Sequence, residues 1–352
     1  MKIGIDVSPL ETGNFLSHRV RGTGFYIKNL KSSFIKFYPE NQYFFFSKNK
    51  KIPAGLDVVH YPYFEPFFLT LPFKKQTRTV VTVHDLTPIV FPKNFPKGVK
   101  GTIKWGIQKK ILKRADAIIT DSECSRKDIV KHAGINPEKI YTIYLAAGEE
   151  FTQIEKSEVR TEKFKKKYGL PEKFILYVGD VTWNKNLPRF LEAVGKIGVP
   201  LIMAGKALTD NNFDKSNPWN QDLIKVKKMV KENKKVRLLG FVPTEDLVVL
   251  YNIATVFVMP SIYEGFGLPV LEAMSCGCPV VTTKEGSLAE ITGEASSFVD
   301  PYSVESISKG ILNLFKNQDL QKDLSVKGLN QAKKFSWKKT AQETMNIYEK
   351  KN

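Results

Sequence analysis

The chain has 352 residues, of which 42% are hydrophobic and 26% are charged, so two globular domains of ordinary size are expected. These values exclude a coiled coil, a collagen and a disulfide-stapled scaffold. Lys and Arg number 54 against 36 Asp and Glu, a formal net charge of +18. That excess favours an anionic partner such as nucleic acid, a phosphate ligand or an acidic membrane surface. It is uneven, because residues 1–170 carry a net +14 and residues 171–352 only +4.

The cysteines and the apolar runs indicate the compartment. Cys124, Cys276 and Cys278 are too few, and odd in number, for the disulfide framework of a secreted protein. The first ten residues lack the basic stretch and apolar run of a signal peptide, and no window reaches the roughly 18 apolar residues that span a bilayer. We therefore expect a cytoplasmic protein, or one that is peripheral on the inner face of the cell membrane.

Short apolar runs rich in β-branched residues alternate with amphipathic stretches along nearly the whole chain. The expected strands, in chain order, are residues 3–7, 43–46, 58–60, 79–83, 117–120, 140–143, 174–178, 201–204, 236–239, 256–259, 280–282 and 297–299. The amphipathic stretches between them include residues 24–37, 99–112, 223–232 and 303–315. This alternation predicts an α/β fold, with parallel sheets covered by helices on both faces.

A polar stretch at residues 151–169 separates the two halves of this pattern. Two αβα units joined there would leave a cleft between the carboxyl edges of their sheets. The last segment, residues 337–348, has helical period and is expected to pack back on the first unit. The predicted domains are therefore residues 1–165 and 166–335, followed by a returning helix at residues 336–352.

The stretch from Pro260 to Val281 carries the strongest chemical signal. A strand ends at Met259, a loop with Gly265 and Gly267 follows, and a helix begins at Pro269. The backbone N–H groups of such a loop and helix start can bind an anion. Glu264 and Glu272, eight residues apart, could accept hydrogen bonds from two sugar rings of one extended ligand. The alternative is that both glutamates are solvated and the glycines only make a turn.

The whole stretch resembles the E-x7-E signature of glycosyltransferase family 4. Members of that family are retaining, nucleotide-sugar-dependent enzymes of GT-B fold, with two Rossmann-like αβα domains. The resemblance implies that Glu272 binds the ribose hydroxyls of the nucleotide and that Glu264 faces the donor sugar. It also implies that the first domain binds the acceptor and the second the nucleotide sugar. The other donor-binding residues implied in this loop are Gly265, Phe266, Gly267 and Leu268.

Two segments of the first half resemble the same family. The run from Arg21 to Tyr26, with Gly22 and Gly24, looks like the glycine loop that faces the donor phosphates. Val83-His84-Asp85-Leu86 follows a strand and matches the family's H-D position, which places His84 beside the reacting sugar. A plain turn and a structural histidine are the alternatives. Residues 121–128 resemble the family's S-E-x-S-R-x-D-L helix start and predict a capped helix.

In the second half, residues 177–187 match the family's Y-V-G…K-N-L segment, which implies that Lys185 holds the donor diphosphate. Many members carry an Arg where this chain has Asp180 or Asn184. Lys185 therefore acts alone or with Lys206, which follows a glycine. Phe241 and Val242 match the segment whose backbone contacts the base. Residues 287–290 resemble a structural S-x-x-E turn. The implied catalytic residues are His84, Lys185 and Glu264.

The resemblance implies transfer with retention, by front-face attack, and without a metal ion or other cofactor; the sequence has no D-x-D pair. GDP-mannose is the favoured donor, because the segments around His84 and Lys185 look most like those of O-antigen and cell-surface polysaccharide mannosyltransferases. The alternatives are UDP-glucose, UDP-GlcNAc or dTDP-rhamnose with a small-molecule acceptor. A sugar-nucleotide epimerase shares the fold, although the E-x7-E loop argues against it.

The acceptor is the least defined part. In residues 95–114, Ile103, Ile107 and Ile111 recur every four residues, which predicts a helix with a buried stripe and a cationic outer face. We expect that face, together with residues 67–69, to contact an anionic membrane or a polyprenyl-phosphate acceptor; a solvated face is the alternative. The cations concerned are Lys104, Lys109, Lys110 and Arg114. Nucleic acid is not expected, because no recognition helix, zinc finger or RNP motif is present.

Overall fold

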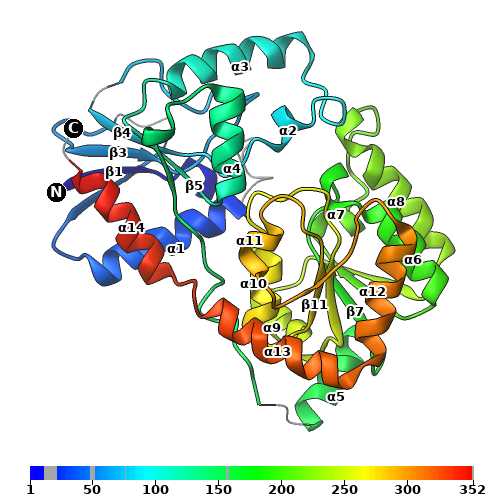
Figure 1. Cartoon of the computed structure of the whole chain (residues 1–352). Helices are drawn as coiled ribbons and strands as arrows, with labels where there is room; N and C mark the ends of the chain where they lie inside the picture. Colours follow the sequence, from blue (N-terminus) through cyan, green and yellow to red (C-terminus); the bar gives the residue numbers. More distant parts are fainter. Residues whose placement is uncertain (12–21, 48–51, 76, 156–157, 351–352) are drawn as a thin grey trace. The chain divides into compact units, whose positions relative to one another are not determined.

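A computed structural model describes residues 1–11, 22–47, 52–75, 77–155 and 158–350 (Figure 1). The chain divides into two compact units. The first unit contains Met1–Ala146 and Phe335–Asn352, and the second contains Ala147–Lys334. The division falls between Ala146 and Ala147, before the polar stretch at residues 151–169, whereas the sequence analysis placed the boundary between residues 165 and 166.

The first unit is built on a six-stranded parallel sheet. Its strands are β1 (Lys2–Asp6), β2 (Gln42–Phe46), β3 (Val58–Tyr61), β4 (Arg78–Thr82), β5 (Ala117–Thr120) and β6 (Ile140–Thr142), in the spatial order β2-β1-β3-β4-β5-β6. Its helices include α1 (Gly22–Phe37), α2 (Thr87–Val90), α3 (Gly98–Leu112) and α4 (Glu123–Asp128). In Figure 1, α3 and α4 cover one face of this sheet and α1 covers the other. Both faces are buried, which explains the continuous apolar runs of the strands.

The second unit repeats the plan with a different strand order. Its strands are β7 (Ile175–Val178), β8 (Leu201–Ala204), β9 (Val236–Gly240), β10 (Val256–Met259), β11 (Val280–Thr282) and β12 (Ser297–Phe298), in the order β12-β11-β10-β7-β8-β9. Its helices are α5 (Glu158–Tyr168), α6 (Leu187–Ile197), α7 (Lys206–Thr209), α8 (Gln221–Glu232), α9 (Thr244–Ile253), α10 (Leu268–Ser275), α11 (Leu288–Thr292), α12 (Val304–Lys316) and α13 (Gln318–Ala332). In Figure 1, α10 lies on one side of this sheet and α6 and α12 lie on the other.

The strand and helix predictions are confirmed. Every predicted strand lies within one residue of a strand of the structure, and the four predicted amphipathic stretches correspond to α1, α3, α8 and α12. The two parallel sheets with surrounding helices make two Rossmann-like domains, as expected for a GT-B fold.

Each sheet has one point at which its strand order reverses. This point lies between β1 and β3 in the first sheet and between β7 and β10 in the second. Connections on the two sides of such a point run to opposite faces, so the loops that leave the carboxyl ends diverge and open a crevice for ligands. In the second sheet, the loops that leave this point carry Lys185 and Glu264.

The C-terminal helix α14 (Trp337–Glu349) belongs to the first unit, as predicted. It lies beside α1, on the same side of the sheet (Figure 1). The Thr340 hydroxyl donates to the carbonyl of Tyr144 at 2.7 Å, and the Arg78 guanidinium donates to the carbonyl of Ile347 at 3.1 Å. No described helix is both long and apolar enough to cross a bilayer.

The predicted buried stripe of α3 is wrong. Ile103 is 58% exposed and Ile107 is half-buried, whereas Gly101, Gln108 and Leu112 face the core. A spacing of four residues drifts away from the helical period of 3.6, so positions 101, 108 and 112 share a face better than positions 103, 107 and 111 do. The buried glutamine is satisfied, because its amide nitrogen donates to the carbonyl of Phe68 at 2.6 Å.

Candidate active site

Two loops at the reversal point of the second sheet are joined to each other. The lysine loop, residues 179–186, follows β7, and the acidic loop, residues 260–267, follows β10. The backbone N–H of Ile262 donates to the carbonyl of Asn184 at 2.7 Å, and the Asn184 side-chain amide donates to the carbonyl of Tyr263 at 2.9 Å. Asn184 is buried and holds the two loops together. It is therefore a structural residue at a position where many family members carry an arginine.

Asn186 adds a second connection between these loops. Among the described residues it is the one non-glycine with a left-handed backbone, at φ 58°. Asparagine tolerates this region better than most residues do. Its side-chain amide donates to the carbonyls of Pro260 at 3.1 Å and Pro301 at 2.7 Å. These buried hydrogen bonds fix the turn that directly follows Lys185.

The joined loops bring Lys185 and Glu264 together. The Lys185 Nζ lies 2.7 Å from Oε1 and 2.8 Å from Oε2 of Glu264, and the Ser261 hydroxyl donates to Oε1 at 2.6 Å. The side chains are only 17% and 9% exposed, respectively. A buried charge needs a partner of this kind, because isolating it from water is costly. Two of the three predicted catalytic residues are thus in direct contact.

The turn before α11 is hydrogen-bonded to the acidic loop. The Ser287 hydroxyl lies 3.0 Å from the carbonyl oxygen of Glu264 and 2.9 Å from that of Phe266. Gly286 has φ +62°, and a Cβ there would lie 2.7 Å from the backbone N and O of Glu264. The Ser287 side chain makes no cap bond to its own helix. The S-x-x-E turn is therefore structural, as predicted, and its serine supports the acidic loop.

Helix α10 carries the second glutamate of the signature. The helix begins at Leu268, after Gly267 with φ 97°. Glu272 lies in its second turn, and its Oε2 accepts a hydrogen bond from the Tyr251 hydroxyl at 2.8 Å. Tyr251 is fully buried; burial first, and then the Glu272 carboxylate, raise its pKa well above the ordinary value. It therefore stays a protonated donor that orients the carboxylate.

Phe241 and Val242, two further predicted donor-binding residues, follow the carboxyl end of β9, and Lys206 follows that of β8. Phe241 is 64% exposed, whereas Val242 is buried. Lys206 is exposed and directly follows Gly205, at the carboxyl end of β8. A Cβ at Gly205 would lie 2.1 Å from the carbonyl oxygen of Gly179, so the backbones that follow β7 and β8 approach closely there. That approach requires glycine.

In the first unit, His84 is held by a carboxylate that the sequence did not single out. Its Nδ1 lies 2.7 Å from Oδ2 of Asp121, which directly follows β5. Burial lowers the pKa of His84, but the hydrogen-bonded Asp121 carboxylate, with smaller contributions from Asp85 and Glu65, raises it, and the net shift is upward. The Nε2 of His84 and the Oδ1 of Asp121 are buried and have no hydrogen-bond partner among the described residues.

The signal for Asp121 was available in the sequence. It follows the strand next to β4, and polar side chains at the carboxyl ends of neighbouring parallel strands meet at one edge. The motif around it, residues 121–128, predicts a capped helix start. That prediction is confirmed, because the Ser122 hydroxyl accepts the N–H of Ser125 at 3.1 Å.

The predicted glycine loop lies partly outside the described residues, which exclude Arg21. Gly22 is the exposed first residue of α1, and Gly24 is buried. A Cβ at Gly22 would meet nothing within 4 Å. The described part of the chain therefore does not itself require a glycine at this position.

The four predicted acceptor cations are not equivalent. Lys109 donates to the carbonyl of His132 at 2.8 Å, and the Lys104 ammonium lies 5.4 Å from the centroid of the Phe68 ring. Lys110 is exposed. Arg114 donates to the carbonyl of Phe73 at 3.3 Å. Phe67, which was expected at the surface, is buried under α3, so that part of the prediction is wrong.

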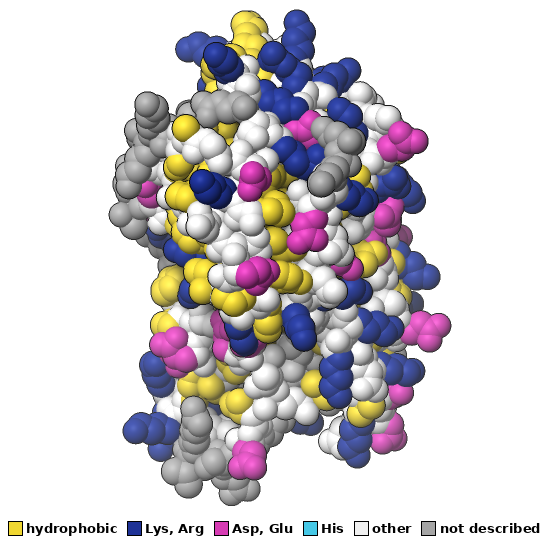
Figure 2. All heavy atoms as spheres, turned by 90° about the vertical axis from the view of Figure 1, so that its left-hand side faces the viewer, with side chains coloured by type: hydrophobic (Ala, Val, Ile, Leu, Met, Phe, Trp, Pro, Cys, Tyr) yellow, Lys and Arg dark blue, Asp and Glu magenta, His cyan; other side chains and the backbone are white. Residues whose placement is uncertain are grey.

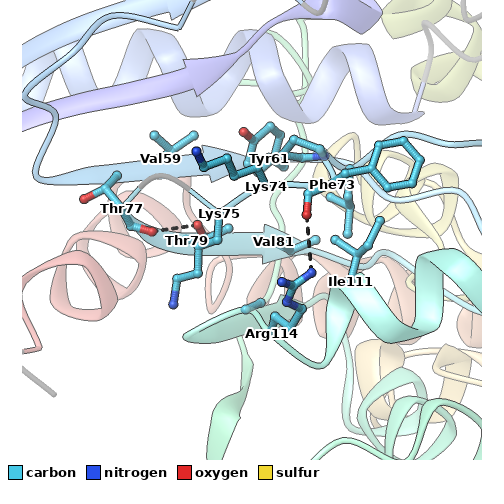
Figure 3. A pocket seen from close by; sticks show the side chains of 13 residues that line it. Val59, Tyr61, Phe73, Lys74, Lys75, Thr77, Thr79, Val81, Ile111 and Arg114 are labelled. Carbon is cyan, nitrogen blue, oxygen red and sulfur yellow. Dashed lines mark hydrogen bonds between the residues drawn. The ribbon is translucent and has the colours of Figure 1, made fainter.

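Arg114 also lines a pocket between β3, β4 and the end of α3 (Figure 3). Its walls include Val59, Tyr61 and Val81, and Lys74 also lines it. None of the other three predicted cations, all of which are described, lines it. His84, which follows the carboxyl end of β4, does not line this pocket. The pocket is therefore separate from the residues predicted to act on the sugar.

Comparison with known proteins identifies the family. The sequence profile of "Glycosyltransferase Family 4" matches residues 14–147, and that of "Glycosyl transferases group 1" matches residues 159–331. O-antigen chain mannosyltransferase B of Escherichia coli is 34% identical over 301 residues, which cover 83% of this chain and 75% of that protein. The chain belongs to glycosyltransferase family 4. It is therefore a glycosyltransferase.

Other family relatives are similar over a smaller share of their length. The serotype-specific mannosyltransferase WbdA of Escherichia coli is 29% identical over 271 residues, 75% of this chain but only 32% of WbdA. Solved structures agree with the GT-B fold. Sucrose-phosphate synthase from Thermosynechococcus elongatus has a TM-score of 0.78 at 18% identity, covering 99% of this chain and 98% of that one. Anabaena Alr3699/HepE, solved with UDP and glucose, has a TM-score of 0.72 at 15% identity, covering 98% of each chain.

Proposed function

We propose that this glycosyltransferase moves mannose from GDP-mannose to a glycan or lipid-linked acceptor, with retention of anomeric configuration, in cell-surface polysaccharide synthesis. The observation that carries the proposal is the pairing of Lys185 with Glu264 at the reversal point of the second sheet. The similarity to O-antigen chain mannosyltransferase B supports mannose as the sugar.

In this proposal the second unit holds the donor. Lys185 binds the diphosphate and stabilises the charge that grows on the leaving group. Glu264 accepts hydrogen bonds from sugar hydroxyls, and the backbone of residues 265–268 meets the sugar and phosphate. Glu272 accepts from the ribose, with its Oε2 already oriented by Tyr251. Lys206 is the second cation for the diphosphate, because it follows the close approach of β7 and β8.

The proposed chemistry is front-face substitution. The bond between the anomeric carbon and the phosphate oxygen breaks while the acceptor oxygen bonds to the same face of that carbon. The departing phosphate oxygen takes the acceptor's proton. His84, oriented by Asp121, positions the sugar, and its backbone or side chain stabilises the positive charge that develops on the sugar ring. We propose that no metal ion is needed, because lysine and loop amides neutralise the diphosphate.

A donor screen that measures released nucleotide tests the proposal. GDP-mannose should give the highest turnover, and the product should keep the α configuration of the donor by NMR. Turnover should persist in EDTA. If the protein prefers UDP-glucose, UDP-GlcNAc or dTDP-rhamnose, the proposed donor is wrong, but the protein is still a glycosyltransferase. No turnover and no binding with any nucleotide sugar would contradict the assignment.

The outer face of α3 is the proposed membrane contact of the acceptor-binding unit. Val99 and Ile103 are 79% and 58% exposed, and Lys100 and Lys110 are exposed on the same helix. At the top of Figure 2, the level of α3 in Figure 1, dark-blue side chains surround a yellow apolar tip. Exposed apolar side chains among lysines are typical of a helix that rests on anionic lipid.

Vesicle co-sedimentation tests this contact. The protein should bind vesicles that contain phosphatidylglycerol at low salt and should not bind pure phosphatidylcholine. The double variant Val99→Ser/Ile103→Ser should reduce binding several-fold without a change in the melting temperature. Val326→Ser, an exposed apolar residue on α13, is the matched control. Equal binding by the double variant and the control would contradict the role of α3.

A further inference from the structure

A buried hydrogen-bonded chain links the C-terminal helix to the strand that leads to His84. The Tyr348 hydroxyl lies 2.6 Å from Nδ1 of His60, and the Nε2 of His60 lies 2.8 Å from Oγ1 of Thr82. The same Oγ1 lies 3.1 Å from the Tyr26 hydroxyl. All four side chains are buried, and they come from four different elements: α14, β3, β4 and α1. We call these four residues the buried relay.

The relay has a defined chemical state. Burial, and to a lesser extent the charge of His84, lower the pKa of His60 to about 3, so its ring is neutral at ordinary pH. A neutral imidazole has one donor and one acceptor nitrogen, so its two hydrogen bonds depend on each other. Burial raises the pKa of both tyrosines, which therefore stay protonated. Removing one hydroxyl at the Tyr348 end leaves a buried ring nitrogen without a partner, and the tautomer of His60 is then free to change.

The relay ends on the ring that contacts His84. Tyr26 packs edge-to-face against the His84 imidazole, with centroids 4.9 Å apart and planes at 88°. Trp337, from the start of α14, packs against the Tyr26 ring at 6.2 Å. Helix α14 thus holds Tyr26 at both ends, at its hydroxyl through the relay and at its ring through Trp337. Thr82 also lies only two residues before His84 on the same chain segment.

We propose that Tyr348 is a positioning residue for His84, acting through His60, Thr82 and Tyr26. The inference rests on the proposed role of His84 in transfer, but the coupling itself can be measured without turnover. Helix α14 would then help to position His84, in addition to packing against the first unit.

Imidazole NMR tests the coupling directly, because the chain has only four histidines. In full-length Tyr348→Phe, the ¹⁵N shifts of His60 should report a changed tautomer mixture, and the titration midpoint of His84 should move. The charged groups that act on His84 are Asp121, Asp85 and Glu65. The substitution alters none of these residues. Tyr43→Phe is the matched control, since its hydroxyl donates to the carbonyl of Tyr38 outside the relay.

With the best donor, Tyr348→Phe should lower kcat about tenfold and leave the donor KM unchanged, as misplacement of a reacting group does. The control should match the native protein in both values. An unchanged His84 titration in a folded Tyr348→Phe protein overturns the inference. If no donor is turned over, the proposed function fails, while the NMR comparison still decides the coupling.

A second pair of variants covers the case in which Tyr348→Phe does not fold. Thr82→Val keeps the shape of the side chain but removes the hydroxyl at the centre of the relay. Thr82→Ser keeps the hydroxyl. The inference requires the valine variant to shift the His84 titration and the serine variant to keep it close to native. Equal His84 titrations in the two variants would overturn it.

Discussion

Both units carry candidate residues at the carboxyl edge of their sheet, but they hold them by different means. In the second unit, two neighbouring loops are bonded to each other, and Lys185 and Glu264 meet between them. In the first unit, the Asp121 partner of His84 lies 37 residues away in the chain. The buried relay that ends beside His84 begins on a helix at the opposite end of the sequence.

The two units also differ in net charge. The first unit has 28 Lys and Arg against 13 Asp and Glu, a net +15, and the second has 26 against 23, a net +3. Yet the group that contacts His84 is a carboxylate, and the lysine singled out for the diphosphate belongs to the nearly neutral unit. Net charge therefore describes the surface of a unit and does not locate its reactive groups.

Among these variants, the largest loss of activity is expected at Lys185. Lys185→Ala should lower kcat/KM by about 10³-fold, because it removes charge stabilisation of the leaving group from a largely buried position. Lys206→Ala, at an exposed neighbouring position, should cost about tenfold or less. Steady-state kinetics with GDP-mannose give both values. If kcat/KM falls more in Lys206→Ala than in Lys185→Ala, the exposed Lys206 is the main contact of the diphosphate.

The two glutamates of the signature should separate in their kinetic effects. Glu264→Gln should lower kcat by about 10²-fold with little change in nucleotide affinity, because that carboxylate is proposed to face the sugar. Glu272→Gln should chiefly weaken binding of the nucleotide, measured by isothermal titration with GDP. Negligible effects of both changes would contradict the donor assignment for the second unit.

The pH dependence of His84 tests the first unit. In Asp121→Asn the titration midpoint of His84 should fall, because burial, which lowers the pKa, is then no longer opposed by the carboxylate. A raised pKa in the folded protein adds stability that is present below the ordinary value of 6.5 and is lost as the pH rises through the folded pKa.

The unfolding free energy of Asp121→Asn should therefore lose its His84-dependent decline across that pH range. Chemical denaturation at several pH values measures this change, and Asp116→Asn, the partner of Lys75 at the other end of the sheet, is the control. A His84 titration identical in the native and Asp121→Asn proteins would exclude the carboxylate as the cause.

Sequence reasoning reached much further in the second unit than in the first. The strands were predictable because doubly buried parallel strands are continuous apolar runs. The acidic loop and the start of α10 were predictable because the glycines, Glu264 and Glu272 lie in one uninterrupted stretch. The pairing of His84 with Asp121, and of His60 with Tyr348, depends on strand order and on where a distant helix packs. One sequence does not encode these contacts as a local pattern. The predicted buried stripe of Ile103, Ile107 and Ile111 failed for a different reason, because a spacing of four residues drifts away from the helical period of 3.6.

The smallest expected effects are on stability, and they come from replacing one glycine in each unit. Gly22→Ala should change the unfolding free energy by less than about 0.5 kcal/mol, because its Cβ would meet nothing within 4 Å. Gly286→Ala should destabilise by about 1–3 kcal/mol, because its Cβ would lie 2.7 Å from the backbone of Glu264 and its φ is +62°. Denaturant titration gives both values. Turnover measurements then distinguish a glycine that a ligand approaches from a glycine that the fold itself requires. If the donor phosphates approach the backbone at Gly22, Gly22→Ala should lower turnover without lowering stability. Gly286→Ala should lower both turnover and stability. A Gly22→Ala protein with native activity would remove the glycine loop of the first unit from the donor site.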